Sequence, residues 1–308
     1  MRSIITFGFT QDLSENKNII MHDISFEAIE NKETILTLQT EWRNSLTFPN
    51  DSGDDLPIDY SQHWTLKLDE KIVGYACVSE MNSLYQFYIT PKYLMHGTAV
   101  LGEFIKQREI KKATVGTNNP IYLSLIMHFQ KSTEIDSYLF KDMEEVTQEE
   151  RDAEFRIAEL AELERVLNFT VRAYGKSEES KESQDWSRNY YSDCLSKGVI
   201  FVLEKEEEII GILEVRTTNL RTKITTFGLV VLPEYRNQGY GSYLLVKGKS
   251  IAKSRDSEAI CGCNVKNISS QKAIEKSGFR KLHLLLLVNL EYSNRNKTNG
   301  KEDEREEK

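Results

Sequence analysis

The residues best suited to chemistry form a glycine-rich loop in the second half of the chain, Arg236-Asn-Gln-Gly-Tyr-Gly-Ser242. An apolar run ends at Val231, Pro233 stops it as a strand, and helical spacing begins at Tyr240. A strand, a tight turn and a helix N-terminus in this order direct backbone N–H groups and the positive end of a helix dipole at one point. This arrangement predicts a phosphate or pyrophosphate site at the N–H groups of residues 238–241.

Two common phosphate-binding motifs do not fit this loop. The dinucleotide fingerprint Gly-x-Gly-x-x-Gly places its third glycine where the chain has Leu244. A P-loop ends in Gly-Lys-Ser/Thr, as Gly248-Lys-Ser250 does, but its first glycine would fall on Tyr243. The pattern that remains is Arg236-x-x-Gly239-x-Gly241.

This pattern resembles the acyl-CoA-binding loop of the GNAT acyltransferase superfamily. There, Arg/Gln-x-x-Gly-x-Gly/Ala commonly follows a strand that ends in Pro-Glu-Tyr-Arg, as Pro233 to Arg236 do. The family's second signature is Asn-x-x-Ala/Ser, a short helix and Glu-Lys-x-Gly-Phe, which resembles Asn267 to Phe279. Gly278 suits the left-handed cap that would end this helix. The chain therefore resembles a GNAT enzyme in two signatures that occur in order.

The resemblance implies that acetyl-CoA is the co-substrate and that no metal takes part. The strand before the loop would contact the pantetheine arm and the thioester oxygen through its backbone, and Asn267 and Ser270 would lie along the arm. The residues expected to bind the cofactor are Leu229, Val230, Val231, Arg236, Asn237, Gln238, Gly239, Tyr240, Gly241, Ser242, Asn267 and Ser270.

The general base is harder to assign. Some family members have a carboxylate upstream on the splayed strand, where this chain has Thr225 and Thr226. Glu214 is the nearest alternative, and strand alternation would place it on one face with Ile210 and Ile212. A carboxylate on an apolar strand at a cleft is a candidate base with a raised pKa. A solvated Glu214, or one paired with Arg216 or Arg221, fits the sequence equally well.

The proton donor for the departing thiolate also differs from the family pattern. Many members carry a tyrosine where this chain has Ile274, which has no proton to donate. Cys261, Cys263 or water are the substitutes, although each cysteine fits a small buried apolar residue better. The acceptor pocket is expected at residues 174–191, where Trp186, Tyr190 and Tyr191 suit cation–π contact with an amine or a place in the core.

The two halves of the sequence repeat each other. Ile72–Val78 matches Ile209–Val215, and Pro91–Ala99 matches Pro233–Gly241. Gln130–Ser132 falls where Glu275–Ser277 does, although no Asn-x-x-Ser with Gly-Phe is evident near residues 122–134. In the first copy, leucine (Leu94) and alanine replace the loop's arginine and second glycine, which removes a charge-assisted phosphate contact. We therefore predict a tandem duplication in which only the second copy binds the cofactor.

The implied fold class is α/β with a mixed (α+β) sheet. Each of two tandem GNAT-like domains would be a twisted, mostly antiparallel sheet with flanking helices and a splayed central strand pair. We predict a degenerate domain at residues 1–145, a catalytic domain at 146–292 and a disordered polar tail at 293–308. Strands are expected at residues 4–9 and 18–24, a loop at 49–57 and a loop or helix at 175–186. One helical face is expected to comprise Ile157, Leu160, Leu163, Leu167, Val171 and Tyr174.

Composition narrows the class of protein. The 308 residues carry a formal net charge of −8, which argues against a nucleic-acid binder and suits an enzyme for cationic amines. The longest apolar stretch, Leu284 to Val288, is too short for a bilayer, and the four cysteines form no disulfide or zinc pattern. We expect a cytoplasmic protein that takes a small-molecule amine and binds neither nucleic acid nor membrane, with a homodimer left open.

The leading interpretation is an acetyl-CoA-dependent N-acetyltransferase that works by direct transfer. The missing tyrosine and carboxylate keep a second interpretation open, a non-catalytic acyl-CoA-binding or interaction protein with the same fold. A different acyl donor or a thiol acceptor is a third.

Overall fold

The computed structural model describes residues 22–50, 61–175, 181–219 and 223–291. The strand expected at residues 4–9, most of that at 18–24, most of the loop at 49–57 and the tail at 293–308 lie outside these residues.

The first half runs from a short strand to a long one, with helices between. Its elements are β1 (Ile24–Ile29), η1 (Lys32–Ile35), α1 (Leu36–Ser45), β2 (Gln62–Leu68), β3 (Lys71–Val78), β4 (Ser83–Ile89), η2 (Pro91–His96), α3 (Gly97–Gln107), β5 (Lys112–Gly116), α4 (Pro120–Ile126), η3 (Met127–Phe129) and β6 (Gln130–Asp142).

The second half repeats this order with one more helix. Its elements are β7 (Glu154–Ile157), η4 (Leu160–Glu162), α5 (Leu163–Tyr174), α6 (Lys181–Ser196), β8 (Ile200–Lys205), β9 (Glu208–Asn219), β10 (Lys223–Val231), η5 (Pro233–Tyr235), α7 (Tyr240–Ser254), β11 (Glu258–Asn264), α8 (Ile268–Lys276) and β12 (Phe279–Leu290).

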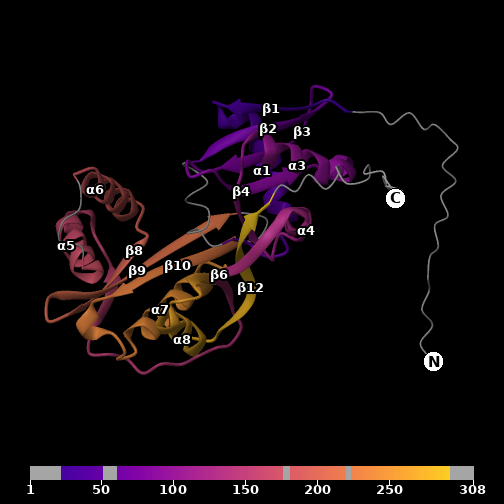
Figure 1. Cartoon of the computed structure of the whole chain (residues 1–308). Helices are drawn as coiled ribbons and strands as arrows, with labels where there is room; N and C mark the ends of the chain where they lie inside the picture. The colour runs from indigo at the N-terminus through magenta and orange to yellow at the C-terminus, as the bar shows by residue number, and fades with distance from the viewer. Residues whose placement is uncertain (1–21, 51–60, 176–180, 220–222, 292–308) are drawn as a thin grey trace, which may run out of the picture.

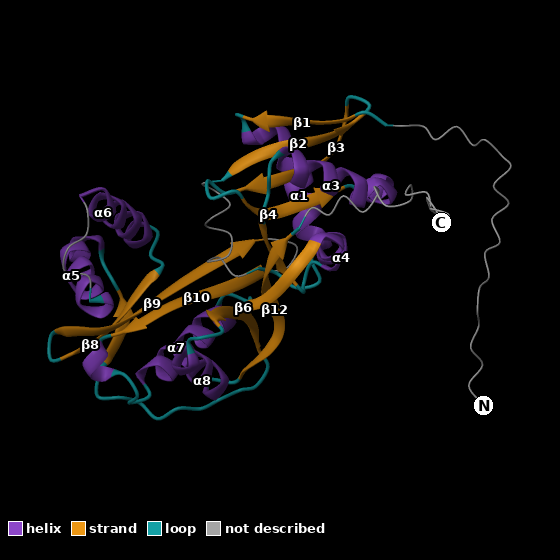
Figure 2. Ribbon diagram, viewed as in Figure 1, coloured by secondary structure: helices purple, strands orange, loops and turns teal. Residues whose placement is uncertain are grey.

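The strands of both halves form one continuous sheet of 12 strands, in the order β1-β2-β3-β4-β5-β12-β6-β11-β10-β9-β8-β7 (Figure 2). β4 and β5 pair in parallel, as do β10 and β11, and the other neighbours are antiparallel. This mixed sheet with flanking helices confirms the predicted fold class.

The last strands of the two copies are interleaved at the centre of the sheet. β12 lies between β5 and β6 of the first half, and β6 lies between β11 and β12 of the second. β6 pairs with β12 from Phe279↔Asp142 to Leu290↔Gln130. Each half therefore relies on a strand from the other, while the boundary at residues 145/146 stays a prediction.

Helices cover both faces of the sheet in the second half (Figure 1). α7 and α8 lie on one face and α5 and α6 on the other. The predicted helical face was partly wrong. Ile157 belongs to β7, and the side chains that α5 buries are Val166, Phe169, Thr170 and Ala173. The helix ends at Gly175, whose φ of 66° is the left-handed cap.

The match of Gln130–Ser132 to Glu275–Ser277 was also wrong, because Gln130 begins a strand and residues 275–277 end a helix. The counterpart of Asn267 is Asn119. Each asparagine accepts a hydrogen bond from the backbone N–H three residues later, Asn119 from Tyr122 (3.2 Å) and Asn267 from Ser270 (3.1 Å). The sequence comparison missed Asn119 because its helix continues as Pro-Ile-Tyr, without the serine of the signature.

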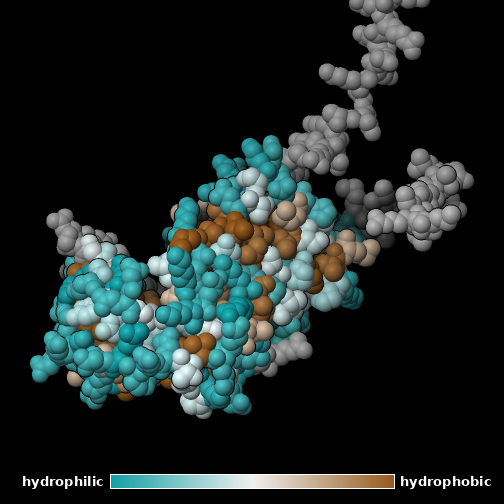
Figure 3. All heavy atoms as spheres, turned by 90° about the horizontal axis from the view of Figure 1, so that it is seen from below, coloured by the Kyte–Doolittle hydropathy of each residue, from teal (hydrophilic) through white to brown (hydrophobic). Residues whose placement is uncertain are grey.

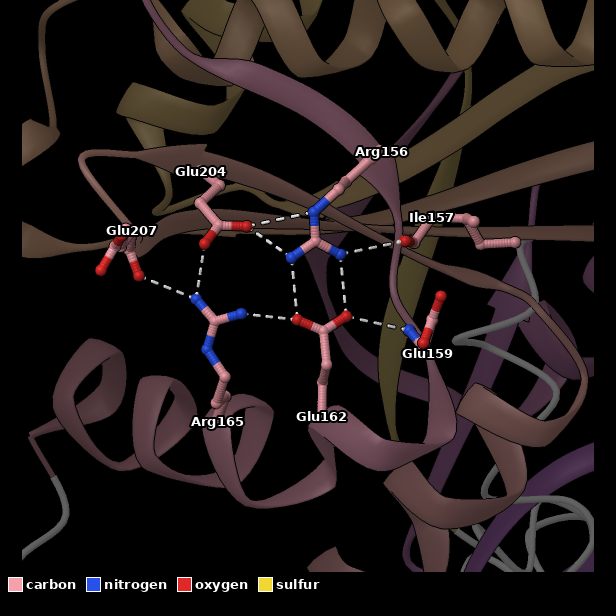
Figure 4. Close-up of polar contacts among 7 residues, drawn as sticks. All are labelled: Arg156, Ile157, Glu159, Glu162, Arg165, Glu204 and Glu207. Carbon is pink, nitrogen blue, oxygen red and sulfur yellow. Dashed lines mark hydrogen bonds and ion pairs between the residues drawn. The ribbon is translucent and has the colours of Figure 1, made fainter.

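A cluster of two arginines and two glutamates fastens α5 to the sheet edge (Figure 4). Both Nη atoms of Arg156 on β7 donate to Glu162, each at 2.8 Å, and its Nε donates to Glu204 on β8 at 3.1 Å. Arg165 on α5 donates to Glu162 (2.6 Å) and to Glu204 (2.7 Å). The hydrogen bonds from Arg156 lower the pKa of Glu162 to about 2. The cluster holds α5 over the end of β9 and β10.

We expect Glu162→Gln to destabilise the protein by about 2 kcal/mol at pH 7, since both arginines lose a charged partner. A lowered pKa stabilises the folded state fully above the ordinary carboxylate range, and this contribution is lost as the pH falls toward the folded value. The stability difference between wild type and Glu162→Gln should therefore shrink from pH 4.5 toward pH 2. Urea unfolding between pH 7 and 3 measures it.

Glu145→Gln is the matched control, because the Glu145–Lys253 pair is exposed on both sides and should leave stability unchanged. A difference that stays constant with pH would contradict the role given to the cluster.

The surface is mainly hydrophilic on the face seen from below, with apolar side chains gathered across its middle (Figure 3). Among the described residues, the helices are all too short or too polar to span a membrane.

Candidate active site

A cleft of about 720 Å³ opens where β10 and β11 diverge. Their parallel pairing ends at Thr226↔Ile260, so residues 227–231 and 261–264 separate and leave backbone groups facing the gap. The N-terminus of α7 and one side of α8 close the cleft. The splayed strand pair thus creates a slot with a helix N-terminus at its end.

The glycine loop presents the N-terminus of α7 without a side-chain cap. Asn237 (φ 62°) and Gly239 (φ 88°) both take left-handed conformations, which turn successive N–H groups in one direction. The first N–H groups of a helix have no intrahelical acceptor, and the dipole adds positive potential there. Lys272 and Lys276 also line the cleft. The geometry suits an extended ligand with phosphate groups.

Most residues expected to bind the cofactor meet in this cleft. Its lining includes Leu229, Val230, Val231, Arg236, Asn237, Gly239, Gly241, Ser242, Asn267 and Ser270. The side chains of Gln238 and Tyr240 turn elsewhere. Gln238 donates to the Glu234 carbonyl at 2.8 Å, and Tyr240 is buried in the core. Only their backbone groups remain with the loop.

The guanidinium of Arg236 is held by backbone carbonyls. Its Nε donates to Val231 at 3.0 Å and its Nη2 to Ala173 at 2.8 Å. Arg236 therefore ties the loop to the end of β10 and to the last turn of α5. A direct contact with phosphate stays a prediction.

A second cavity of about 650 Å³ lies between α5, α6 and the sheet. It shares Tyr174, Gly228, Leu229 and Val230 with the cofactor cleft. The aromatic residues expected at the acceptor pocket, Trp186, Tyr190 and Tyr191, line it together with Glu214. Two cavities that share one strand as a wall could bring two substrates together across that strand.

Glu214 lies at the floor of the second cavity, directly opposite Gly228 in the β9–β10 pairing. Its carboxylate is paired with Arg216 and accepts a hydrogen bond from Tyr190 Oη at 3.0 Å. Burial raises the pKa of Tyr190 well above its ordinary value, so the phenol stays protonated as the donor. The pairing with Arg216 that the sequence left open is therefore present.

A bulge changes the neighbours of Glu214. In the β8–β9 register, Leu203 pairs with Gly211 and Glu204 with Ile209, so Ile210 is the extra residue. Ile210 packs in the core beside α7, whereas Ile212 packs on the α5 side. The expected alternation, with Glu214, Ile212 and Ile210 on one face, was wrong for Ile210.

Two family models match the chain in tandem. An acetyltransferase (GNAT) domain matches residues 31–143, and the acetyltransferase (GNAT) family matches residues 161–279. The chain belongs to the GNAT acyltransferase superfamily. It is an acyltransferase of the GNAT type with two family domains in succession.

Solved structures share this fold. A GNAT acetyltransferase from Colwellia psychrerythraea has a TM-score of 0.79 at 20% identity and covers 87% of this chain and 100% of its own. A tandem GNAT protein from the clavulanic acid biosynthesis pathway has a TM-score of 0.59 at 12% identity, with 88% and 99% covered. A GCN5-related N-acetyltransferase from Sphaerobacter thermophilus has 0.54 at 14%, with 86% and 94% covered. A comparison with curated proteins gave no significant match.

Three positions of the second GNAT domain lack an ionisable group suited to proton transfer. Thr225 is fully buried and shares hydrogen bonds with Thr217 (2.8 Å) and Ser257 (2.6 Å). Ile274 is buried in the core beside α7. Burial raises the pKa of Cys263 to about 11, which makes its thiol a weak acid. Tyr174, which lines both cavities, is a hydroxyl at the junction that the family pattern did not point to.

The corresponding loop of the first GNAT domain is built differently. η2 runs directly into α3, and Gly97 is right-handed with a φ of −55°, so the N–H groups form no left-handed turn. Two methyl carbons of Leu125 lie 3.1 and 3.2 Å from the place of a Cβ on Gly97, and Phe87 and Ile89 on β4 are buried. Apolar side chains thus fill the space that the cleft occupies in the second domain.

Arg151 is a candidate ligand residue that sequence reasoning missed. A Cβ on Gly239 would lie 2.8 Å from Arg151 Nη2, so this guanidinium lies directly over the glycine loop. Its Cζ is 5.7 Å from the centre of the Tyr240 ring. Arg151 belongs to the segment between the two domains, and no local pattern links it to a loop about 90 residues later.

We expect Arg151→Ala to weaken acetyl-CoA binding about tenfold and to make the affinity less dependent on salt, because an exposed guanidinium beside a phosphate site acts by charge. Arg43→Ala removes the same charge from α1 in the other half and should leave affinity unchanged. Titration calorimetry at low and high salt measures both variants. Equal affinity of Arg151→Ala and wild type at low salt would contradict the assignment.

Proposed function

We propose that the protein is an acetyl-CoA-dependent N-acetyltransferase that transfers the acetyl group directly to a small amine in its second GNAT domain. The observation that carries the proposal is the pair of cavities on either side of residues 228–230. One has a phosphate-binding helix N-terminus and the other has a carboxylate, Glu214.

The cofactor cleft fits acetyl-CoA by shape and charge. The splayed strands offer backbone groups from Leu229 to Val231, the α7 N-terminus offers N–H groups, and Arg151, Lys272 and Lys276 supply positive charge. When bound, acetyl-CoA supplies an acyl thioester. The strand backbone would orient the thioester, and the loop would hold the pyrophosphate.

Glu214 and Tyr174 are proposed to move the protons. Arg216 and Tyr190 hold the Glu214 carboxylate beside Gly228, where it attracts the acceptor's ammonium and takes its proton. Tyr174 is the hydroxyl nearest both cavities and would protonate the departing thiolate in place of Ile274. The amine nitrogen forms a bond to the acyl carbon as the carbon–sulfur bond breaks.

A non-catalytic acyl-CoA-binding protein is the second candidate. It is favoured by the buried Ile274 and by the arginine pairing of Glu214, which stabilises the negative charge and weakens it as a base.

Thiol release from acetyl-CoA over a panel of primary amines separates the two. Release above the background hydrolysis with any amine supports the enzyme, and we expect Glu214→Gln to lower kcat about 100-fold with acetyl-CoA affinity unchanged. Binding of acetyl-CoA without release from any amine would establish the binding protein instead. No binding at all would overturn both.

A further inference from the structure

Helix α5 carries two apolar stripes. One, with Val166, Phe169 and Ala173, is buried in the core. The other, with Leu167, Val171 and Tyr174, lines the second cavity, where Val171 is 48% exposed and Tyr174 58% exposed. Apolar side chains left open at a cavity wall favour a ligand with an apolar body.

The facing wall on α6 is aromatic. The Trp186 ring is 52% exposed and stacks on Tyr190, with ring centres 5.0 Å apart and planes 15° apart. Tyr190 in turn meets Tyr191 edge to face at 5.2 Å. One side of the Trp186 ring is thus covered by a rigid aromatic partner, which leaves the ring pre-oriented for a second flat group.

The charges of the cavity select against anions and against several cations. Its described lining contains three carboxylates and one guanidinium, from Glu164, Asp185, Glu214 and Arg188. This excess of negative charge repels an acceptor that carries a carboxylate. Two of the carboxylates already have a cation, since Arg188 donates to Glu164 and Arg216 pairs with Glu214. Few sites remain for the additional ammonium groups of a polyamine.

We propose that the acceptor is a monocationic arylalkylamine, an amine borne on a flat apolar ring and free of carboxylate. The ring lies between Trp186 and the Leu167–Val171 stripe, and the ammonium reaches Glu214 through the space beside Tyr190. This inference rests on the proposed function, because it names the acceptor of the same reaction.

Binding to the CoA-saturated protein tests the proposal without turnover. Calorimetry would compare 2-phenylethylamine with phenylalanine, which adds a carboxylate, and with spermidine, which lacks the ring and adds cations. We expect 2-phenylethylamine to bind at least about tenfold more tightly than either. Trp186→Ala should weaken its binding about tenfold and Trp186→Phe should retain it, whereas the exposed Met95→Ala in the first domain should change nothing.

Val171→Ser provides a second test that leaves the α6 stack intact, and we expect a several-fold loss of 2-phenylethylamine affinity. Tighter binding of phenylalanine or spermidine, or unchanged affinity in both Trp186→Ala and Val171→Ser, would overturn the assignment. If 2-phenylethylamine binds as expected while thiol release fails with every amine, the proposed reaction is wrong and the site assignment stands.

Discussion

A fragment of residues 146–292 alone should fail to fold into a cooperative domain. Without β6, β11 loses its antiparallel partner along Ile260–Asn264, and β12 loses the partner that runs along it from Phe279 to Leu290. Whole domains are stable by only about 5–15 kcal/mol, so the loss of a central strand from the sheet exceeds what remains. Size-exclusion chromatography and urea unfolding of the fragment measure this.

Co-expression with residues 1–145, which carry β6, should restore both cooperative unfolding and acetyl-CoA binding. The outcome that contradicts this account is a monomeric 146–292 fragment that unfolds cooperatively and binds acetyl-CoA alone. In that case the interleaved strands would connect two domains that are each stable without the other.

Gly239→Trp should weaken acetyl-CoA binding by roughly 100-fold or more, equal to about 2.7 kcal/mol. Gly239 has a φ of 88°, and any Cβ there would lie 2.8 Å from Arg151 Nη2. A side chain therefore strains the turn, displaces a cation and fills the place where N–H groups face the phosphates. Titration calorimetry with acetyl-CoA measures the loss.

Gly239→Ala and Gly198→Ala form a matched pair, because Gly198 is also left-handed (φ 63°) but lies in the turn between α6 and β8. Both variants should lose stability, and only Gly239→Ala should lose acetyl-CoA affinity. Full affinity in Gly239→Trp would disprove the assignment of the loop.

The sequence alone determined the elements whose cause is local. Pro233 ends a strand because it has no N–H, Gly239 marks a left-handed turn, and Asn267 caps α8 through its own side chain. The hairpins β2–β3 and β8–β9 follow from strand runs separated by two residues. These features, with the family resemblance, were enough to predict the fold class and to bring most cofactor-binding candidates to one cleft.

Tertiary structure decided what depends on residues far apart in the chain. β6 and β12 read equally well as strands, but their pairing depends on which neighbours complete the sheet, and that choice interleaves the two copies. The same reason hid the position of Arg151 over the glycine loop and the pairing of Glu214 with Arg216 and Tyr190. Local patterns specify a turn or a cap through bonds within a few residues, whereas the partners of a strand edge or a buried charge are set only when the whole sheet is packed.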